Sequence, residues 1–194
     1  MIGASEQGNS IQGKPVSIFG DKPVYSEEEW ALVARGFNEM GRLAREKDMI
    51  FTVHHHMGTG VQTEEEIDRL MELTDPNLVY LLYDTGHLAF SGEDALRVLR
   101  KYAKRVKHVH LKSVRNDVVA KAKAGGYSFL DAVRAGAFTV PGDGDFDFQP
   151  VFDILAENGY EGWVVVEAEQ DPAKANPFEY AVMAREYIRR TAGL

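Results

Sequence analysis

Four clusters of ionisable residues each follow directly after a short apolar run of the chain. The clusters are His54 to His56, Asp84 with His87, His108 to Lys112, and Glu167 with Glu169. Strands that end in such residues, repeated along one chain, place them together at the carboxyl rim of a parallel barrel. Imidazoles and carboxylates together suit a divalent ion of borderline hardness, such as Mn, Co or Zn. The sequence therefore predicts a metal and proton-transfer site.

The predicted ligands lie one or two strand-helix units apart, which would bring them to the same rim. They are His54, Asp84, His110 and Glu167. A second group is predicted to bind substrate or move protons, because each member lies two or three residues from a ligand on the same face of its strand or beyond a turn. This group is His56, His87, Lys112 and Glu169. His55 is expected to face away from the site.

Each of these residues has a simpler interpretation when it is taken alone. A histidine or carboxylate at a strand end is often a hydrogen-bonded polar group, and Asp84 has the position of a helix-capping residue. Lys112 alone is typical of a solvated surface lysine. Gly86 is interpreted as part of a tight turn that swings His87 back beside Asp84. The occurrence of all four clusters after strand-like runs favours the metal site.

Apolar periodicity predicts strands alternating with helices. Capping-box patterns at Ser26 with Glu29 and at Thr63 with Glu66 mark two helix starts. Helices are expected at about 26–47, 63–73, 93–102, 150–158 and 177–190, and strands at about 49–53, 78–83, 106–111 and 163–166. The segment 115–148 is longer than a usual connection. Within it we expect a short helix at 129–134 and a minimal strand at 138–140.

Composition is typical of a globular protein and excludes several classes. The chain has 194 residues, of which 44% are hydrophobic and 27% charged. The net charge of -8 opposes a nucleic-acid partner, and the absence of cysteine excludes thiolate ligands and disulfides. No apolar run approaches the roughly 18 residues of a membrane span, and the N-terminus lacks a leader pattern. We expect a cytoplasmic protein with no membrane partner.

The four clear strands are too few for a complete barrel, which has eight strands and usually about 250 residues. We interpret residues 1–194 as one domain, a (β/α)8 barrel of the α/β class that lacks its opening units. Glu6, Gln7 and Gln12 are interpreted as remnants of an earlier strand's rim. A smaller open α/β sheet is the alternative. Either fold leaves a strand edge that favours self-association as a homo-oligomer.

The clusters together resemble the xylose-isomerase-like TIM-barrel superfamily and, within it, the inosose dehydratases of myo-inositol catabolism. The resemblance rests on the phrases at 54–63, 82–87, 108–112, 138–144 and 159–172. It implies that Asp84, His110 and Glu167 are metal ligands and that His87 contacts substrate or metal. Sugar isomerases of the superfamily usually have a glutamate where this chain has His54. The resemblance also implies Mn or Co as the ion and glutathione as a further cofactor.

The reaction implied by the resemblance is a metal-dependent dehydration of 2-keto-myo-inositol, a polyol ketone, to a trihydroxycyclohexane-1,2-dione. A metal-dependent sugar isomerase or epimerase is the alternative enzyme, and it would rearrange its substrate without loss of water. An endonuclease of the superfamily needs a basic groove, which the acidic balance of the chain opposes. The alternative that is not an enzyme is a noncatalytic fragment that binds a polyol.

Overall fold

A parallel five-stranded sheet forms the centre of the computed structural model, which describes residues 2–4 and 10–193. The sheet order is β1-β2-β3-β4-β7, so every neighbouring pair runs in the same direction. The strands are β1 (Ile2–Ala4), β2 (Phe51–His54), β3 (Val79–Asp84), β4 (Val106–Leu111) and β7 (Trp163–Val166). β3 is mostly apolar and buried, whereas β4 alternates buried apolar residues with the partly buried Lys107, His108 and His110.

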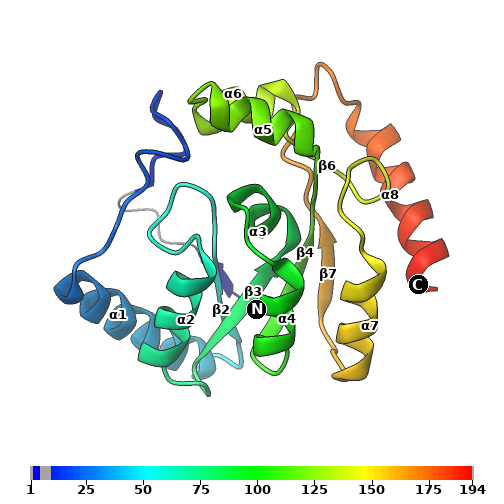
Figure 1. The fold of residues 1–194 in the computed structure, drawn as a ribbon. Helices are drawn as coiled ribbons and strands as arrows, with labels where there is room; N and C mark the ends of the chain where they lie inside the picture. Colours follow the sequence, from blue (N-terminus) through cyan, green and yellow to red (C-terminus); the bar gives the residue numbers. More distant parts are fainter. Residues whose placement is uncertain (1, 5–9, 194) are drawn as a thin grey trace.

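Helices connect these strands and cover the sheet (Figure 1). They are α1 (Glu27–Arg45), α2 (Glu64–Leu73), α3 (Thr85–Ser91), α4 (Ala95–Tyr102), α5 (Asn116–Ala124), α6 (Phe129–Ala135), α7 (Gln149–Glu157) and α8 (Pro177–Ala192). Both predicted capping boxes are present, at the starts of α1 and α2. Figure 1 shows α5 and α6 side by side across the top of the view, above α3. None of the described helices is both long and apolar enough to cross a membrane.

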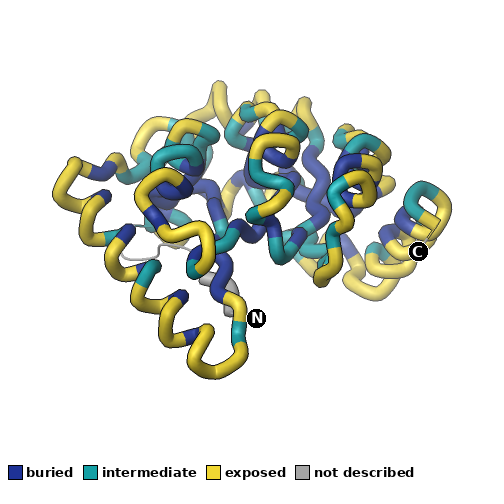
Figure 2. Tube along the Cα trace, turned by 90° about the horizontal axis from the view of Figure 1, so that it is seen from below, coloured by how far each residue is buried: buried dark blue, intermediate teal, exposed yellow. Residues whose placement is uncertain are grey.

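The apolar residues form two clusters. The larger one packs β2, β3 and β4 against the surrounding helices, with fully buried side chains such as Phe51, Leu81 and Val109. The smaller one joins Ile18 and Met57 to Phe90, Phe129 and Phe138, and so lies beneath α5 and α6. Figure 2 shows buried positions in the interior of the molecule and exposed ones on the outer turns of the helices. The second cluster packs the segment 114–138 against Ile18, Met57 and Phe90.

The segment after β4 departs from the sequence prediction in three ways. Residues 116–124 form α5, a helix that was not predicted. The expected strand near 138–140 exists as β6 (Phe138–Thr139), but it pairs antiparallel with β5 (Ser113–Val114) in a separate two-stranded sheet. Consequently β4 and β7 are direct neighbours, and the prediction of two strand-helix units between His110 and Glu167 is wrong. The antiparallel pair of β5 and β6, whose strands are connected through α5 and α6, takes the place of the intervening strand.

Candidate metal and proton-transfer site

The carboxyl ends of four strands bring the predicted ligands together. His54 and Asp84 are the last residues of β2 and β3, His110 lies in β4, and Glu167 follows β7. The register of β3 against β4 shifts by one residue between Leu81 and Leu82, and this shift places Asp84 opposite His110. The strand ends therefore do what the sequence pattern predicts, because parallel strands expose their last residues at one rim.

The donor atoms lie at the spacing of a metal site. Asp84 Oδ2 is 3.3 Å from His54 Nε2 and 3.4 Å from His110 Nδ1. His110 Nδ1 is in turn 3.2 Å from Glu167 Oε2. Ligand atoms held about 2.1 Å from a tetrahedral ion are about 3.4 Å apart, so these separations suit a divalent ion.

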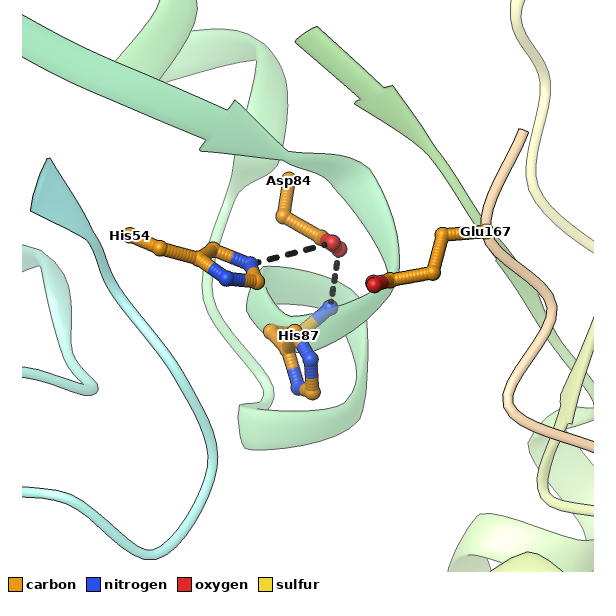
Figure 3. Close-up of side chains that lie close together, drawn as sticks. All are labelled: His54, Asp84, His87 and Glu167. Atoms are coloured by element: carbon orange, nitrogen blue, oxygen red, sulfur yellow. Dashed lines mark hydrogen bonds and ion pairs between the residues drawn. The ribbon is translucent and has the colours of Figure 1, made fainter. Parts of the chain in front are cut away.

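Two buried atoms of this group are otherwise without hydrogen bonds. Within residues 2–4 and 10–193, His110 Nδ1 and Glu167 Oε2 have no hydrogen-bond partner, although they lie close together and near charged groups. A divalent ion in place of the His110 ring proton would satisfy both atoms. His87 also belongs to the group: a nitrogen of its ring lies within 4.8 Å of donor atoms of His54, Asp84 and Glu167 (Figure 3).

Asp84 uses its two carboxylate oxygens for different tasks. Oδ1 accepts hydrogen bonds from the backbone N–H groups of Gly86 (2.8 Å) and His87 (2.9 Å), so Asp84 is the N-cap of α3. Oδ2 faces His54 and His110. Asp84 can therefore cap α3 with one oxygen and bind a metal ion with the other. The interpretation of 84–87 as a tight turn is wrong, because Thr85 already begins a helix and His87 lies in its first turn.

Gly86 is needed for a different reason, which is space for Lys112. A Cβ atom at Gly86 would lie 2.5 Å from Lys112 Cγ and 2.6 Å from its Cβ. The lysine stem therefore passes directly over the first turn of α3. The hydroxyl of Thr85 holds the same segment, since it accepts from the Lys112 backbone N–H at 2.9 Å. Lys112 is fully buried, so the solvated surface lysine is excluded as an interpretation.

The Lys112 ammonium is surrounded by three carboxylates. Its Nζ is 2.7 Å from Glu167 Oε2, 3.6 Å from Asp84 Oδ2, and hydrogen bonded to Glu169. Burial disfavours the charged amine, but Asp84, Glu169 and Glu167 outweigh this effect and raise its pKa above the usual range. Burial likewise disfavours the Asp84 carboxylate, but Lys112 and the neighbouring imidazoles hold the pKa of Asp84 well below its usual range. The buried ammonium and the carboxylates around it therefore keep one another charged.

His87 contributes a neutral imidazole with polar neighbours at both ring nitrogens. Nδ1 lies 3.4 Å from the backbone nitrogen of Met57. Nε2 lies 3.0 Å from the Lys112 ammonium, which can only donate, and 3.2 Å from Glu169 Oε2. Burial and the Lys112 charge hold the pKa of His87 well below its usual range. Nε2 of His87 therefore lies between the Lys112 ammonium and the Glu169 carboxylate, where the imidazole can connect the two groups.

His56 and Glu169 complete the proton-transfer group. The ring of His56 lies against that of His87, with centroids 3.5 Å apart, and its Nε2 is 3.6 Å from Glu169 Oε1. Gln12 Nε2 is 2.5 Å from His56 Nδ1, which places one of the predicted rim residues at the site. Glu6 and Gln7 lie outside the described residues. Burial disfavours charge on Glu169, yet His56, His87 and Lys112 hold its pKa well below the usual range.

Glu167 and Glu169 do not alternate along a strand as the sequence suggested. Strand β7 ends at Val166, and Glu169 has a backbone φ of 42°, in the left-handed region that non-glycine residues rarely adopt. Both carboxylates nevertheless reach Lys112. Unusual backbone of this kind is often found at functional sites, where the surrounding contacts stabilise it.

Sequence reasoning did not find two aromatic residues beside the histidines. The ring of Phe129 lies 5.5 Å from that of His56, and the ring of Phe138 lies 5.2 Å from that of His87 and 5.0 Å from Lys112 Nζ. They come from α6 and β6, and so from the segment 113–148. An aromatic wall of this kind restricts water at the site. Its only signal in the sequence was the unusual length of that segment.

The chain belongs to the xylose isomerase-like TIM barrel family, whose model matches residues 9–191. An inosose dehydratase of Clostridium tetani is 66% identical over the whole chain, and one of Geobacillus thermodenitrificans is 64% identical. The chain spans 65% of the length of each of these relatives.

Solved structures of low sequence identity share the fold. An L-ribulose 3-epimerase matches with a TM-score of 0.65 at 15% identity, over 92% of this chain and 58% of that one. The IolI protein, solved with a zinc atom, matches with a TM-score of 0.66 at 17% identity, over 89% and 59% of the two chains. A probable 3-DHS dehydratase, AsbF of Bacillus anthracis, matches with a TM-score of 0.62 at 16% identity, over 86% and 58%. These structures support the TIM-barrel fold predicted from the sequence.

Proposed function

We propose that this chain carries the metal-binding rim of an inosose dehydratase, a hydro-lyase of inositol catabolism that converts 2-keto-myo-inositol to a trihydroxycyclohexane-1,2-dione. The observation that supports it best is the convergence of four donors from neighbouring strands beside the Lys112–Glu169 pair. The relatives of 59% identity and more bear this name. The metal-binding assignment also draws support from the zinc atom of the IolI structure.

His54, Asp84, His110 and Glu167 would hold the ion. A bound divalent ion would polarise the ketone of the substrate and acidify the hydrogen on the adjacent carbon. Mn or Co fits a donor set of two imidazoles and two carboxylates. Mn or Co as the native ion, glutathione as a second cofactor, self-association and a cytoplasmic location stay predictions.

The charge states of Glu169 and Lys112 determine the direction in which each can move a proton. A carboxylate accepts, so Glu169 removes the proton from the carbon beside the ketone. An ammonium group donates, so Lys112 gives a proton to the departing hydroxyl, which leaves as water. The carbon–hydrogen bond becomes the new carbon–carbon double bond of an enol, which converts to the second ketone of the dione.

The direct contact between the two groups restores the site after each turnover. Glu169 would hold the proton taken from the substrate, and Lys112 would lack one. Because the two side chains are hydrogen bonded to each other, the proton passes from Glu169 to Lys112 without leaving the site. His56, beside Oε1, and His87, beside Oε2, orient the Glu169 carboxylate.

The test is to incubate the folded chain with 2-keto-myo-inositol in heavy water, first with Mn²⁺ or Co²⁺ and then with a chelator, and to follow the products by proton NMR. Metal-dependent loss of water is expected. Glu169→Gln should abolish turnover because an amide cannot accept the proton, and Glu157→Ala on the exposed face of α7 is the matched control.

Other products would contradict the proposal. An epimer, or deuterium exchange without water loss, would indicate a sugar isomerase that uses the same ion. No reaction by the folded chain or by a chain extended to the length of its relatives would favour a noncatalytic polyol binder. Turnover by the extended chain alone would assign part of the site to the added residues.

A further inference from the structure

His55, the middle residue of the triple histidine, contacts the backbone of the site and none of its donor atoms. It is fully buried, and its Nε2 accepts a hydrogen bond from the Asp84 backbone N–H at 3.1 Å. The pairing of β2 with β3 ends at His54 and Leu82, two residues before Asp84. The imidazole therefore provides an acceptor at the point where the strand ladder has ended.

The Asp84 contact also determines the tautomer of His55. A backbone N–H can only donate, so Nε2 must present its lone pair and the ring proton must be on Nδ1. Among the described residues, Nδ1 has no hydrogen-bond partner. A buried donor without a partner costs about 1 to 3 kcal/mol. A phenyl ring would avoid this cost, so the imidazole is better explained by its contact with Asp84 than by packing.

Asp84 is the residue for which a fixed backbone matters most. One of its oxygens begins α3 by capping Gly86 and His87, and the other faces His54 and His110. Both tasks depend on where the chain turns from β3 into α3. The Asp84 N–H lies at that turn, and His55 holds it from the neighbouring strand.

We propose that His55 is a positioning residue that fixes Asp84 for metal binding. The inference rests on the proposed metal-dependent function and extends it to a residue outside the donor set. If His55 acts in this way, loss of its acceptor must weaken metal binding even when the fold is kept. Groups that orient metal ligands from behind typically change metal affinity by about 10- to 100-fold.

Three variants of the chain separate positioning from stability. His55→Phe keeps a ring in the buried site and removes the acceptor. His55→Gln offers an amide oxygen near the position of Nε2 and is the rescue variant. Tyr83→Phe is the matched control. Tyr83 is the residue before Asp84, and its hydroxyl donates a buried hydrogen bond to the Ala95 carbonyl (3.0 Å). The substitution removes this bond and keeps the hydrogen bond of the Asp84 N–H.

The measurement is calorimetric titration of each folded, metal-free variant with Mn²⁺ and Co²⁺, together with the visible spectrum of bound Co²⁺ and the melting temperature. We expect His55→Phe to lose 10- to 100-fold in affinity and to alter the Co²⁺ spectrum. His55→Gln should recover most of both. Tyr83→Phe should lower the melting temperature and leave affinity and spectrum unchanged.

Each outcome decides the matter. Equal affinity in the unaltered chain and in His55→Phe would overturn the inference and leave the proposed function intact. Affinity that falls with melting temperature in all three variants would also overturn it, since the role would then be structural. If the unaltered chain binds neither ion, the metal-dependent function and the inference fail together. If His55→Phe does not fold, His55→Leu, which is smaller and likewise lacks an acceptor, takes its place in the comparison with His55→Gln.

Discussion

The two sides of the candidate site are held by very different surroundings. Asp84 ends β3, His87 lies in α3 and Lys112 directly follows β4, and all three are buried. Glu167 and Glu169 follow β7, and their side chains are 39% and 24% exposed. Trp163, at the start of the same strand, is 71% exposed. The buried side is fixed by packing, whereas the acidic side is held largely by its charge contacts with Lys112 and the histidines.

This difference predicts that the same loss of a ligand has unequal consequences on the two sides. Asp84→Ala removes a fully buried carboxylate that caps α3 and lies beside Lys112, so we expect a loss of about 3 to 5 kcal/mol in the free energy of unfolding. Glu167→Ala also removes a contact to Lys112, but at a side chain that is 39% exposed, where water can replace the carboxylate, so it should change this free energy by less than about 1 kcal/mol. Both substitutions should weaken metal binding by more than about 100-fold, which exceeds the effect of removing a residue that only orients a ligand.

Urea denaturation of the metal-free chain and calorimetric metal titration measure the two effects separately. Glu157→Ala serves as control for removal of an exposed carboxylate. Equal stability losses for Asp84→Ala and Glu167→Ala would show that the acidic side is as firmly built as the buried side.

Gly86→Ala tests the packing of the buried side without changing a charge. Alanine favours a helix by about 1 kcal/mol over glycine, but here its methyl would overlap the stem of Lys112. We expect a net loss of about 1 to 3 kcal/mol in stability and a fall of at least about tenfold in turnover, with metal affinity nearly retained. Gly36→Ala in α1, where a Cβ meets nothing within 4 Å, is the control. A fully active Gly86→Ala would mean that Lys112 is not confined.

The pH dependence of the metal-free chain reports on the contact between the two sides. Burial lowers the pKa of His110, but Asp84 and Glu167 outweigh burial and raise it to about 9. A raised pKa means that His110 stabilises the fold fully below its ordinary pKa of 6.5 and loses this contribution as pH rises through 9. Melting temperature, measured in chelator, should therefore fall between pH 6.5 and 9.

Metal affinity should change in the opposite direction over the same window. A ligand imidazole must lose its proton, so the apparent affinity should rise by up to about tenfold per pH unit until the pKa of His110 is passed. Calorimetric titration at several pH values measures it. Affinity that stays constant across this window would remove His110 from the ligand set.

The smallest effect is expected at the exposed edge. Trp163→Ser should change the free energy of unfolding by less than about 0.5 kcal/mol, because the side chain has little packing to lose. It should also reduce any self-association, since an apolar residue on an edge strand promotes pairing between chains. Sedimentation velocity and urea denaturation provide the measurements. A large loss of stability would show that the edge contributes to the core.

The sequence allowed the fold and the gathering of the eight site residues to be predicted, because both follow from strands that end in ionisable residues. It did not reveal the antiparallel pair of β5 and β6, since two-residue strands carry no measurable periodicity. It assigned Gly86 to a turn, because the approach of Lys112 across the fold has no local signature. The role of His55 was missed for a related reason: alternation along a strand shows that it faces away from the site, but not what it contacts there.

The shared carboxylate of Asp84 gives the chain an internal spectroscopic reporter. The amide protons of Gly86 and His87 bond to one oxygen of a group whose other oxygen faces the donor cluster. Any cation that withdraws electron density from Asp84 weakens both hydrogen bonds and moves both amide resonances. Glycine amide signals are usually well separated in a nitrogen–proton correlation spectrum. The positions of the Gly86 and His87 amide signals would thus report whether the site holds an ion, without any substitution in the chain.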